Sequence, residues 1–225
     1  MLKTRVARVA LAAYRKFCMN RKYIFIGLAV AVVAVVGVVL VWPGAGEVKN
    51  YPSSGTDVIA FGDSLVQGVG ASAPEKNFVS VLSAQLGRPI VNLGVSGNTT
   101  TDGVQRLGEL DKYQPKVVMI LLSGNDRLRG IPQEQTLANL ATIIEYIQNR
   151  GAVAVLLGVR GDLLGNGHDD KLKALAENRQ AAYLPDVLDG LFGNSRYMAD
   201  LVHPNDAGYA KIADRIYPLL RTYAD

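Results

Sequence analysis

The sequence predicts an α/β domain in which a mainly five-stranded parallel sheet lies between layers of helices, a three-layer α/β/α sandwich. Five short apolar runs predict the strands, at residues 57–61, 89–93, 117–122, 152–157 and 181–187. Continuous apolar runs suit strands that are covered on both faces. Segments of helical periodicity lie between these runs, and this alternation implies right-handed crossovers between parallel strands.

Two segments carry the clearest helical periodicity. In the first, apolar residues step by three, four and three positions, at Leu137, Leu140, Ile144 and Ile147. The same steps recur near the end of the chain, at Tyr209, Ile212, Ile216 and Leu219. Each set forms one apolar stripe on a helix, which should face the sheet.

The first 55 residues have a different character. Residues 1–22 form a basic leader, with seven Lys and Arg residues and no acidic residue. Residues 23–42 predict one transmembrane helix, because the 19 residues from Ile24 to Trp42 carry no charge and would span about 28 Å as a helix. Residues 43–55 are rich in Pro, Gly and Ser and predict a linker, which leaves residues 56–225 as the folded domain.

The basic leader also predicts the orientation of this segment. By the positive-inside rule the N-terminus lies in the cytoplasm and the domain on the periplasmic or extracellular side of the membrane. A cleaved signal peptide is the alternative, but its apolar region is usually about 7–15 residues and is followed by a small-x-small cleavage site. The stretch WPGAGE at residues 42–47 is a poor site of this kind. We therefore expect an uncleaved, single-pass anchor.

The charge of the remaining chain argues against a nucleic-acid partner. Seven of the 24 basic residues lie in the leader, which leaves 17 basic residues against 20 acidic ones. The single cysteine, Cys18, also lies in the leader, so the domain has neither a disulfide nor a cysteine-based zinc site. Its position next to the membrane segment would allow palmitoylation, although an inert thiol is the simpler interpretation.

Polar loops follow four of the predicted strands, where open parallel sheets bind their ligands. These loops read GDS at 62–64, GVSGNTT at 94–100, SGND at 123–126 and RGDLLGNGHDD at 160–170. They should gather along one edge of the sheet. An acyl-transfer site needs a nucleophile, a base, a group that orients the base and donors for the developing oxyanion.

Two histidines could serve as the base. His203 lies in ADLVHPND, with Asp200 three residues earlier, a separation short enough for one turn to hold the carboxylate near the imidazole. His168 lies in a glycine-rich acidic loop without apolar neighbours to fix it. His203 is therefore the stronger candidate.

Four blocks of the chain together resemble a known family. FGDSLVQGVGA (61–71) resembles the first block of the GDSL esterases, also called SGNH hydrolases, and NLGVSGNTT, SGND and DLVHP resemble its later blocks in the same order. The resemblance covers about residues 56–220 and implies the flavodoxin-like fold of that family. The stretch GNDRLRG (124–130) is similar to the branch that contains bacterial thioesterase/lysophospholipase and arylesterase enzymes.

The resemblance implies roles for five residues. Ser64 would attack the acyl carbonyl, His203 would take its proton, and Asp200 would orient the imidazole. The backbone N–H groups of Ser64 and Gly97 and the side-chain amide of Asn125 would form the oxyanion hole. The resemblance implies no metal and no cofactor.

These residues also have structural interpretations. Ser64 could cap the helix that follows it, and Gly97 and Asn125 could be ordinary turn residues. The segment HPND could begin the last helix, with Asn205 or Asp206 as its cap.

Four further features bear on the site. Asp63 is expected to brace the turn or the helix start rather than react. Ser123 stands where the similar thioesterase branch has a second glycine. GVGASA (68–73) approaches a dinucleotide-binding fingerprint but lacks the third glycine, and GHDD (167–170) is more typical of a solvated loop than of a metal site.

We therefore expect a membrane-anchored serine esterase that hydrolyses carboxylic esters or thioesters of acyl chains, with small-molecule or lipid acyl esters, including lysophospholipids, as substrates. An O-deacetylase of cell-wall or surface polysaccharide is the alternative on the same fold. A non-catalytic binding domain is the alternative from another class. The sequence does not indicate the acyl-chain length or the oligomeric state.

Overall fold

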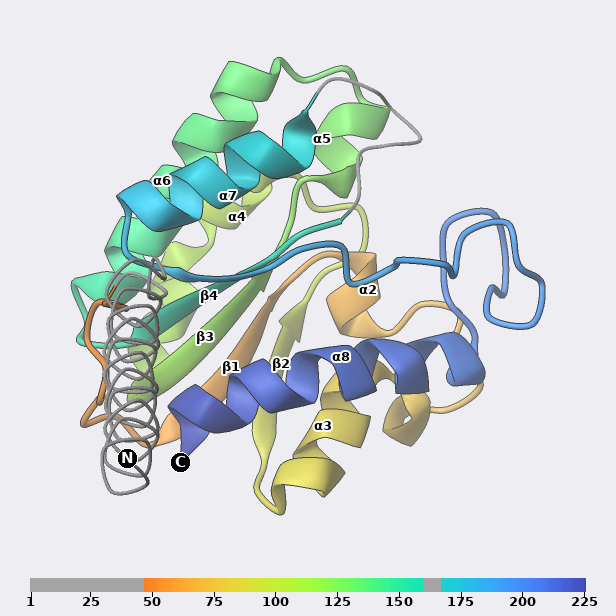
Figure 1. Cartoon of the computed structure of the whole chain (residues 1–225), viewed down its shortest axis with the longest axis horizontal. Helices are drawn as coiled ribbons and strands as arrows, with labels where there is room; N and C mark the ends of the chain where they lie inside the picture. Colours follow the sequence, from red (N-terminus) through yellow and green to blue (C-terminus); the bar gives the residue numbers. More distant parts are fainter. Residues whose placement is uncertain (1–46, 160–166) are drawn as a thin grey trace, which may run out of the picture. The chain divides into compact units, whose positions relative to one another are not determined.

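The computed structural model describes residues 47–159 and 167–225 (Figure 1). The predicted leader, the predicted anchor and the first residues of the predicted linker lie outside the described residues. Within the described ranges, no helix has both the length and the apolar character that a membrane span requires.

The five predicted strands form one parallel sheet in the order β2-β1-β3-β4-β5. The strands are β1 (Asp57–Gly62), β2 (Ile90–Gly94), β3 (Pro115–Leu121), β4 (Val153–Leu157) and β5 (Ala182–Leu184). After β1 the chain adds β2 on one side and β3 on the other. The direction of winding therefore reverses at β1, and ligands of such sheets bind at this reversal.

Three central strands are buried on both faces, as their continuous apolar runs predict. Nearly every residue of β1, β3 and β4 is buried. The last strand is shorter than its apolar run, residues 181–187, because Pro185 has no N–H for the ladder and Asp186 adopts a positive φ of 35°.

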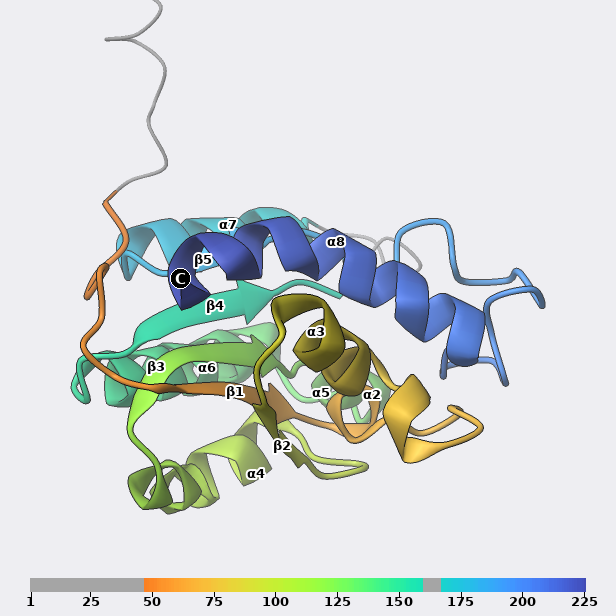
Figure 2. The same cartoon turned by 90° about the horizontal axis from the view of Figure 1, so that it is seen from below.

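Helices cover both faces of the sheet and complete the predicted sandwich (Figures 1 and 2). One face packs against α3 (Phe78–Leu86) and α8 (Asp206–Ala224). The other packs against α6 (Gln133–Gln148) and α7 (His168–Asn178), with α4 (Thr100–Gln105) in the same layer. Two short helices, α2 (Ser64–Gln67) and α5 (Gly124–Leu128), begin just after β1 and β3, and the 3₁₀ turns span Pro74–Lys76 and Leu107–Lys112.

The predicted apolar stripes face the sheet, although Leu137 in α6 and Leu219 in α8 are only partly buried. Leu140, Ile144 and Ile147 in α6 are fully buried, as are Tyr209, Ile212 and Ile216 in α8. At the end of α8, Leu220 is fully buried and Leu219 only partly. Position 220 lies four residues after Ile216 and so falls on the same side of the helix.

Residues 47–55, the described part of the predicted linker, contact the domain at the amino ends of the strands. The Asn50 side chain donates hydrogen bonds to the carbonyls of Gln148 and Ala152, at 2.7 and 3.0 Å. The Ser53 hydroxyl donates to the Gly151 carbonyl at 2.7 Å. These carbonyls lie between the end of α6 and the start of β4. The chain therefore enters the domain at the amino ends of the strands, opposite their carboxyl ends.

Candidate active site

The first site loop follows β1, and its conformation places Ser64 at the start of α2. Asp63 is the N-cap of this helix, since its carboxylate accepts a hydrogen bond from the Leu65 N–H at 3.0 Å. The structure thus confirms the bracing position expected for Asp63, and Ser64 is not the cap. Ser64 is largely buried, with 8% of its surface exposed.

Ser64 and His203, which are 139 positions apart, are hydrogen-bonded. The Ser64 Oγ lies 3.0 Å from the His203 Nε2, and the His203 Nδ1 lies 2.8 Å from the Asp200 Oδ2. Because an ionised carboxylate only accepts hydrogen bonds, the Asp200 contact fixes the proton on Nδ1 and leaves Nε2 free to accept the Ser64 proton. The three side chains form the continuous chain that nucleophilic catalysis by a serine requires.

Asp200 and His203 lie on one tight turn. The Asp200 Oδ1 accepts the backbone N–H groups of Val202 and His203, both at 2.7 Å. The imidazole bond and these two N–H bonds lower the pKa of Asp200 to about 2. The carboxylate therefore stays ionised at neutral pH.

Glycines 68 and 70 have structural roles that explain the glycine-rich stretch after Ser64. Gly68 ends α2 in the left-handed conformation. Gly70 also has a positive φ, and a Cβ there would lie 2.5 Å from the Pro204 carbonyl oxygen and 3.1 Å from the His203 Cβ. The absence of a side chain at Gly70 therefore lets the histidine loop approach α2 closely.

Two further contacts join the loop after α2 to α8. The Tyr209 hydroxyl donates to the Val69 carbonyl at 2.6 Å, and Ser72 donates its N–H and its hydroxyl to Asp206 at 2.8 and 2.6 Å. Asn205 caps α8 by accepting the N–H groups of Ala207 and Gly208, one of the two caps expected for HPND. The segment therefore begins the last helix and also supplies His203.

Gly97 and Asn125 come together from the loops after β2 and β3. Gly97 has a positive φ of 80°, a conformation that favours glycine. The Asn125 Nδ2 donates to the Asn98 carbonyl at 2.9 Å and approaches the Asp63 Oδ2 at 3.4 Å. Within the described chain, neither the Ser64 N–H nor the Gly97 N–H has an acceptor. Within the described residues, two backbone N–H groups therefore have no acceptor, whereas the Asn125 amide already contacts Asn98 and Asp63.

Arg129 and Asp63 contact the loops that carry these donors. The Arg129 guanidinium donates to the Gly97 carbonyl at 2.8 Å. Asp63 is buried beside Ser64, and this burial raises the pKa of its carboxyl to about 6. No sequence pattern marks the contact of Arg129 with Gly97 or that of Asp63 with Asn125, because each depends on how two separate loops fold over the end of β1.

His168 does not contact the site. It is the first residue of α7, and its Nδ1 lies 3.0 Å from the Gln133 Nε2. Burial lowers the pKa of its imidazole. Across the described residues, no group of three or more His, Cys, Asp or Glu side chains is placed to hold a metal ion.

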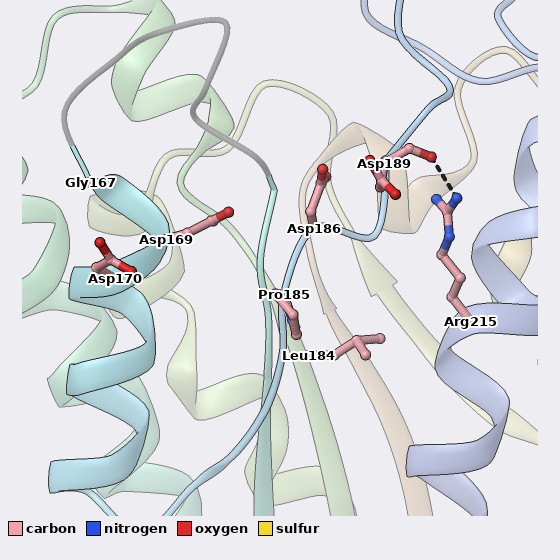
Figure 3. Close-up of a pocket in the computed structure, with 8 residues that line it drawn as sticks. All are labelled: Gly167, Asp169, Asp170, Leu184, Pro185, Asp186, Asp189 and Arg215. Carbon is pink, nitrogen blue, oxygen red and sulfur yellow. Dashed lines mark hydrogen bonds between the residues drawn. The ribbon is translucent and has the colours of Figure 1, made fainter.

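A separate cavity of about 620 Å³ lies beyond β5 and the start of α7 (Figure 3). Four aspartates and Arg215 supply its polar lining, at Asp169, Asp170, Asp186 and Asp189. Because β5 lies three strand positions from β1, this cavity is not the site around Ser64.

Comparisons with known proteins identify the family and the fold. A family model described as the GDSL-like lipase/acylhydrolase family matches residues 60–211. An arylesterase of Vibrio mimicus is 31% identical over 169 residues, which cover 70% of this chain and 84% of the relative. The thioesterase 1/protease 1/lysophospholipase L1 of Escherichia coli K12 is 30% identical over 166 residues, which cover 70% and 79%. A crystal structure of TesA superposes with a TM-score of 0.69 at 28% identity and covers 74% of this chain and 99% of the other.

Proposed function

This chain belongs to the GDSL-like lipase/acylhydrolase family and is a carboxylic ester hydrolase, and on that premise we propose that it cleaves esters or thioesters of acyl chains with Ser64 as its nucleophile. The observation that carries the proposal is the hydrogen-bonded chain from Ser64 through His203 to Asp200, at 3.0 and 2.8 Å.

In the first half of the reaction, the Ser64 Oγ attacks the acyl carbonyl carbon while the His203 Nε2 takes the serine proton. The carbonyl electron pair moves to the oxygen. When this intermediate collapses, the bond to the leaving alcohol or thiol breaks, and His203 protonates the leaving group. Water then repeats these steps on the acyl-serine and releases the carboxylic acid. Asp200 stabilises the imidazolium in both halves.

The negative oxygen of the intermediate needs hydrogen-bond donors that are in place before it forms. We assign this role to the Ser64 N–H, the Gly97 N–H and the Asn125 side-chain amide. The lack of acceptors for the two backbone groups within the described chain supports this assignment. An uncharged amide also avoids the cost of desolvating an ion.

The proposed substrates are acyl esters and thioesters, including arylesters and lysophospholipids. The names of the arylesterase and of the thioesterase 1/protease 1/lysophospholipase L1 support this class. We also propose that residues 23–42 anchor the chain in a membrane, with the catalytic domain on the periplasmic or extracellular side, on the evidence of the apolar run and the basic leader.

Replacement of Ser64 by Ala tests the proposal, with hydrolysis of p-nitrophenyl esters of two to twelve carbons as the readout. We expect Ser64→Ala to lose turnover by at least about 1,000-fold and to lose labelling by a fluorophosphonate probe. Ser96→Ala is the matched control, because Ser96 is an exposed serine in the neighbouring loop. Full activity of Ser64→Ala would refute the proposal, and cleavage of acetyl esters alone would favour an O-deacetylase instead.

A further inference from the structure

Asp126, the residue after Asn125, is a buried carboxylate that accepts several hydrogen bonds. Only 1% of its surface is exposed. Its Oδ2 accepts the Thr100 backbone N–H at 2.8 Å, and its Oδ1 accepts the hydroxyls of Thr100 and Thr136. Burying an ion is costly unless such donors surround it, and three donors surround this carboxylate.

The contacts of Asp126 place it between the two loops that carry the oxyanion donors. Thr100 lies three residues after Gly97 and is the first residue of α4. Asn125, the residue before Asp126, donates to the Asn98 carbonyl at 2.9 Å. Two consecutive residues of the loop after β3 therefore hold two positions of the loop after β2.

The order of the strands explains why such a bridge is needed. β2 and β3 are not neighbours, because β1 lies between them. Their carboxyl ends are thus two strand spacings apart, about 10 Å, and no hydrogen-bond ladder joins them directly. Side chains must fix the position of one loop relative to the other.

Helix α6 supplies a rigid support for the bridge. The Thr136 hydroxyl donates to Asp126 at 3.2 Å, and the Asn139 Nδ2 donates to the hydroxyls of Thr100 and Thr101, both at 3.0 Å. Thr100, Thr136 and Asn139 are all buried. The network therefore has two arms, one to the oxyanion loop through Thr100 and one to the helix through Thr136.

We propose that Asp126 is a positioning residue that sets the distance between the Gly97 N–H and the Asn125 amide by holding Thr100. The proposal rests on the proposed function of these donors. A carboxylate suits the task because it accepts hydrogen bonds at both oxygens, whereas an amide has one acceptor oxygen and would meet either the Thr100 N–H or the two threonine hydroxyls with its NH₂ group. Asp126 does not itself touch the reacting atoms, so its effect should appear in the stabilisation of the oxyanion.

The two arms provide a matched pair of variants in the full chain. Thr100→Val and Thr136→Val each remove one hydroxyl donor to the same Asp126 oxygen at a buried site. Thr100→Val also removes one of the two acceptors of the Asn139 amide, which keeps its bond to Thr101. We expect Thr100→Val to lower kcat for p-nitrophenyl butyrate about 10-fold or more, with KM within about twofold. Thr136→Val should lower thermal stability and should reduce kcat less than Thr100→Val does, because both Asp126–Thr100 contacts involve groups that this variant keeps. Thr100→Ser, which keeps the hydroxyl, should restore kcat.

A binding measurement separates positioning from a merely structural role. A trifluoromethyl ketone forms an oxyanion on Ser64, and its affinity should fall in Thr100→Val by the same factor as kcat. Asp126→Asn should show a larger loss of both, about 100-fold. Equal kcat losses in Thr100→Val and Thr136→Val, no rescue by Thr100→Ser, or unchanged ketone affinity in Asp126→Asn would each overturn the proposal. Undiminished hydrolysis by Ser64→Ala would instead refute the proposed function.

Discussion

Asp200 holds His203 at two points, at the ring and at the backbone. Its Oδ2 lies 2.8 Å from the imidazole Nδ1, and its Oδ1 lies 2.7 Å from the His203 backbone N–H. The second contact, together with that to the Val202 N–H, shapes the turn, and the first orients the ring. One carboxylate thus supports the local fold and the proposed chemistry through different oxygens.

Asp200→Asn should separate these two functions. The amide oxygen can still accept the two backbone N–H groups, but the NH₂ group would face the ring and favour the tautomer that cannot accept the Ser64 proton. We expect kcat to fall by about 10²–10⁴-fold with little change in the melting temperature. Asp200→Ala, which also loses the turn contacts, should be less stable than Asp200→Asn. Ester hydrolysis and thermal unfolding measure the two effects, and wild-type turnover by Asp200→Asn would contradict the role of the carboxylate.

Asp63→Asn should change the pH dependence of stability. Burial raises the pKa of Asp63 from 3.8 to about 6, so the folded protein binds a proton that the unfolded chain has lost between these pH values. Asp63 therefore contributes stability below about pH 4 that is lost as the pH rises through 6, a difference of about 3 kcal/mol. An amide at this position does not titrate. The free energy of unfolding of the variant, relative to that of the wild type, should therefore increase by about this much between pH 4 and pH 8.

Urea unfolding of both proteins at pH 4 and pH 8 measures this gain. A difference in unfolding free energy that stays constant with pH would show that Asp63 does not titrate in this range. The same variant should be less active, since an amide at position 63 can turn N–H groups toward the Asn125 amide, which now approaches the Asp63 oxygen at 3.4 Å.

Ser123→Gly should stabilise the domain. Ser123 is buried and has a φ of 121°, a backbone conformation that costs a residue with a side chain about 1–3 kcal/mol. Glycine adopts it without that cost, so we expect a gain of about 1 kcal/mol after the greater freedom of glycine in the unfolded chain is subtracted. Ser123→Ala keeps the Cβ and should show no gain. Chemical denaturation checks both variants, and equal stability of the two would rule out backbone strain as the cause.

Removal of residues 47–55 should weaken the fold without impairing catalysis. These residues contribute the Asn50 and Ser53 hydrogen bonds and an edge-to-face contact between Tyr51 and Tyr223, with ring centroids 5.2 Å apart. Their loss should cost about 2 kcal/mol and lower the melting temperature by roughly 4–8 °C when chains 56–225 and 47–225 are compared. Turnover at 25 °C should be the same for both, because the contacts lie at the opposite edge of the sheet from Ser64. A large loss of turnover in the shorter chain would contradict this.

The sheet and the meeting of the site loops could be predicted from the sequence because each depends on local patterns and one topological rule. Apolar runs of strand length alternate with helical stripes, and parallel strands bring their carboxyl ends to one edge. The separation of Asp200 and His203 also predicts their contact, since three residues form one turn. The five strands are confirmed, with small changes at their ends.

The supports of the site could not be predicted in this way. Asp126 and Arg129 lie beside the residues singled out from the sequence, but their partners are on another loop. A buried aspartate reads in the sequence like the solvated aspartate of a turn, because burial depends on the whole fold. The need for glycine at position 70 could not be predicted either, because it arises from the close approach of the His203 loop.

The point at which residues 47–55 join the domain has a practical consequence. β1 carries the chain from that entry point to Ser64 over six residues, a distance of about 20 Å. A resin, a fused reporter or an electrode coupled upstream of Glu47 would therefore be attached at the end of the domain opposite the site loops. The loops that carry Ser64 would stay accessible to solvent, which favours attachment at this end over attachment through the site loops when the enzyme is to be used as an immobilised catalyst.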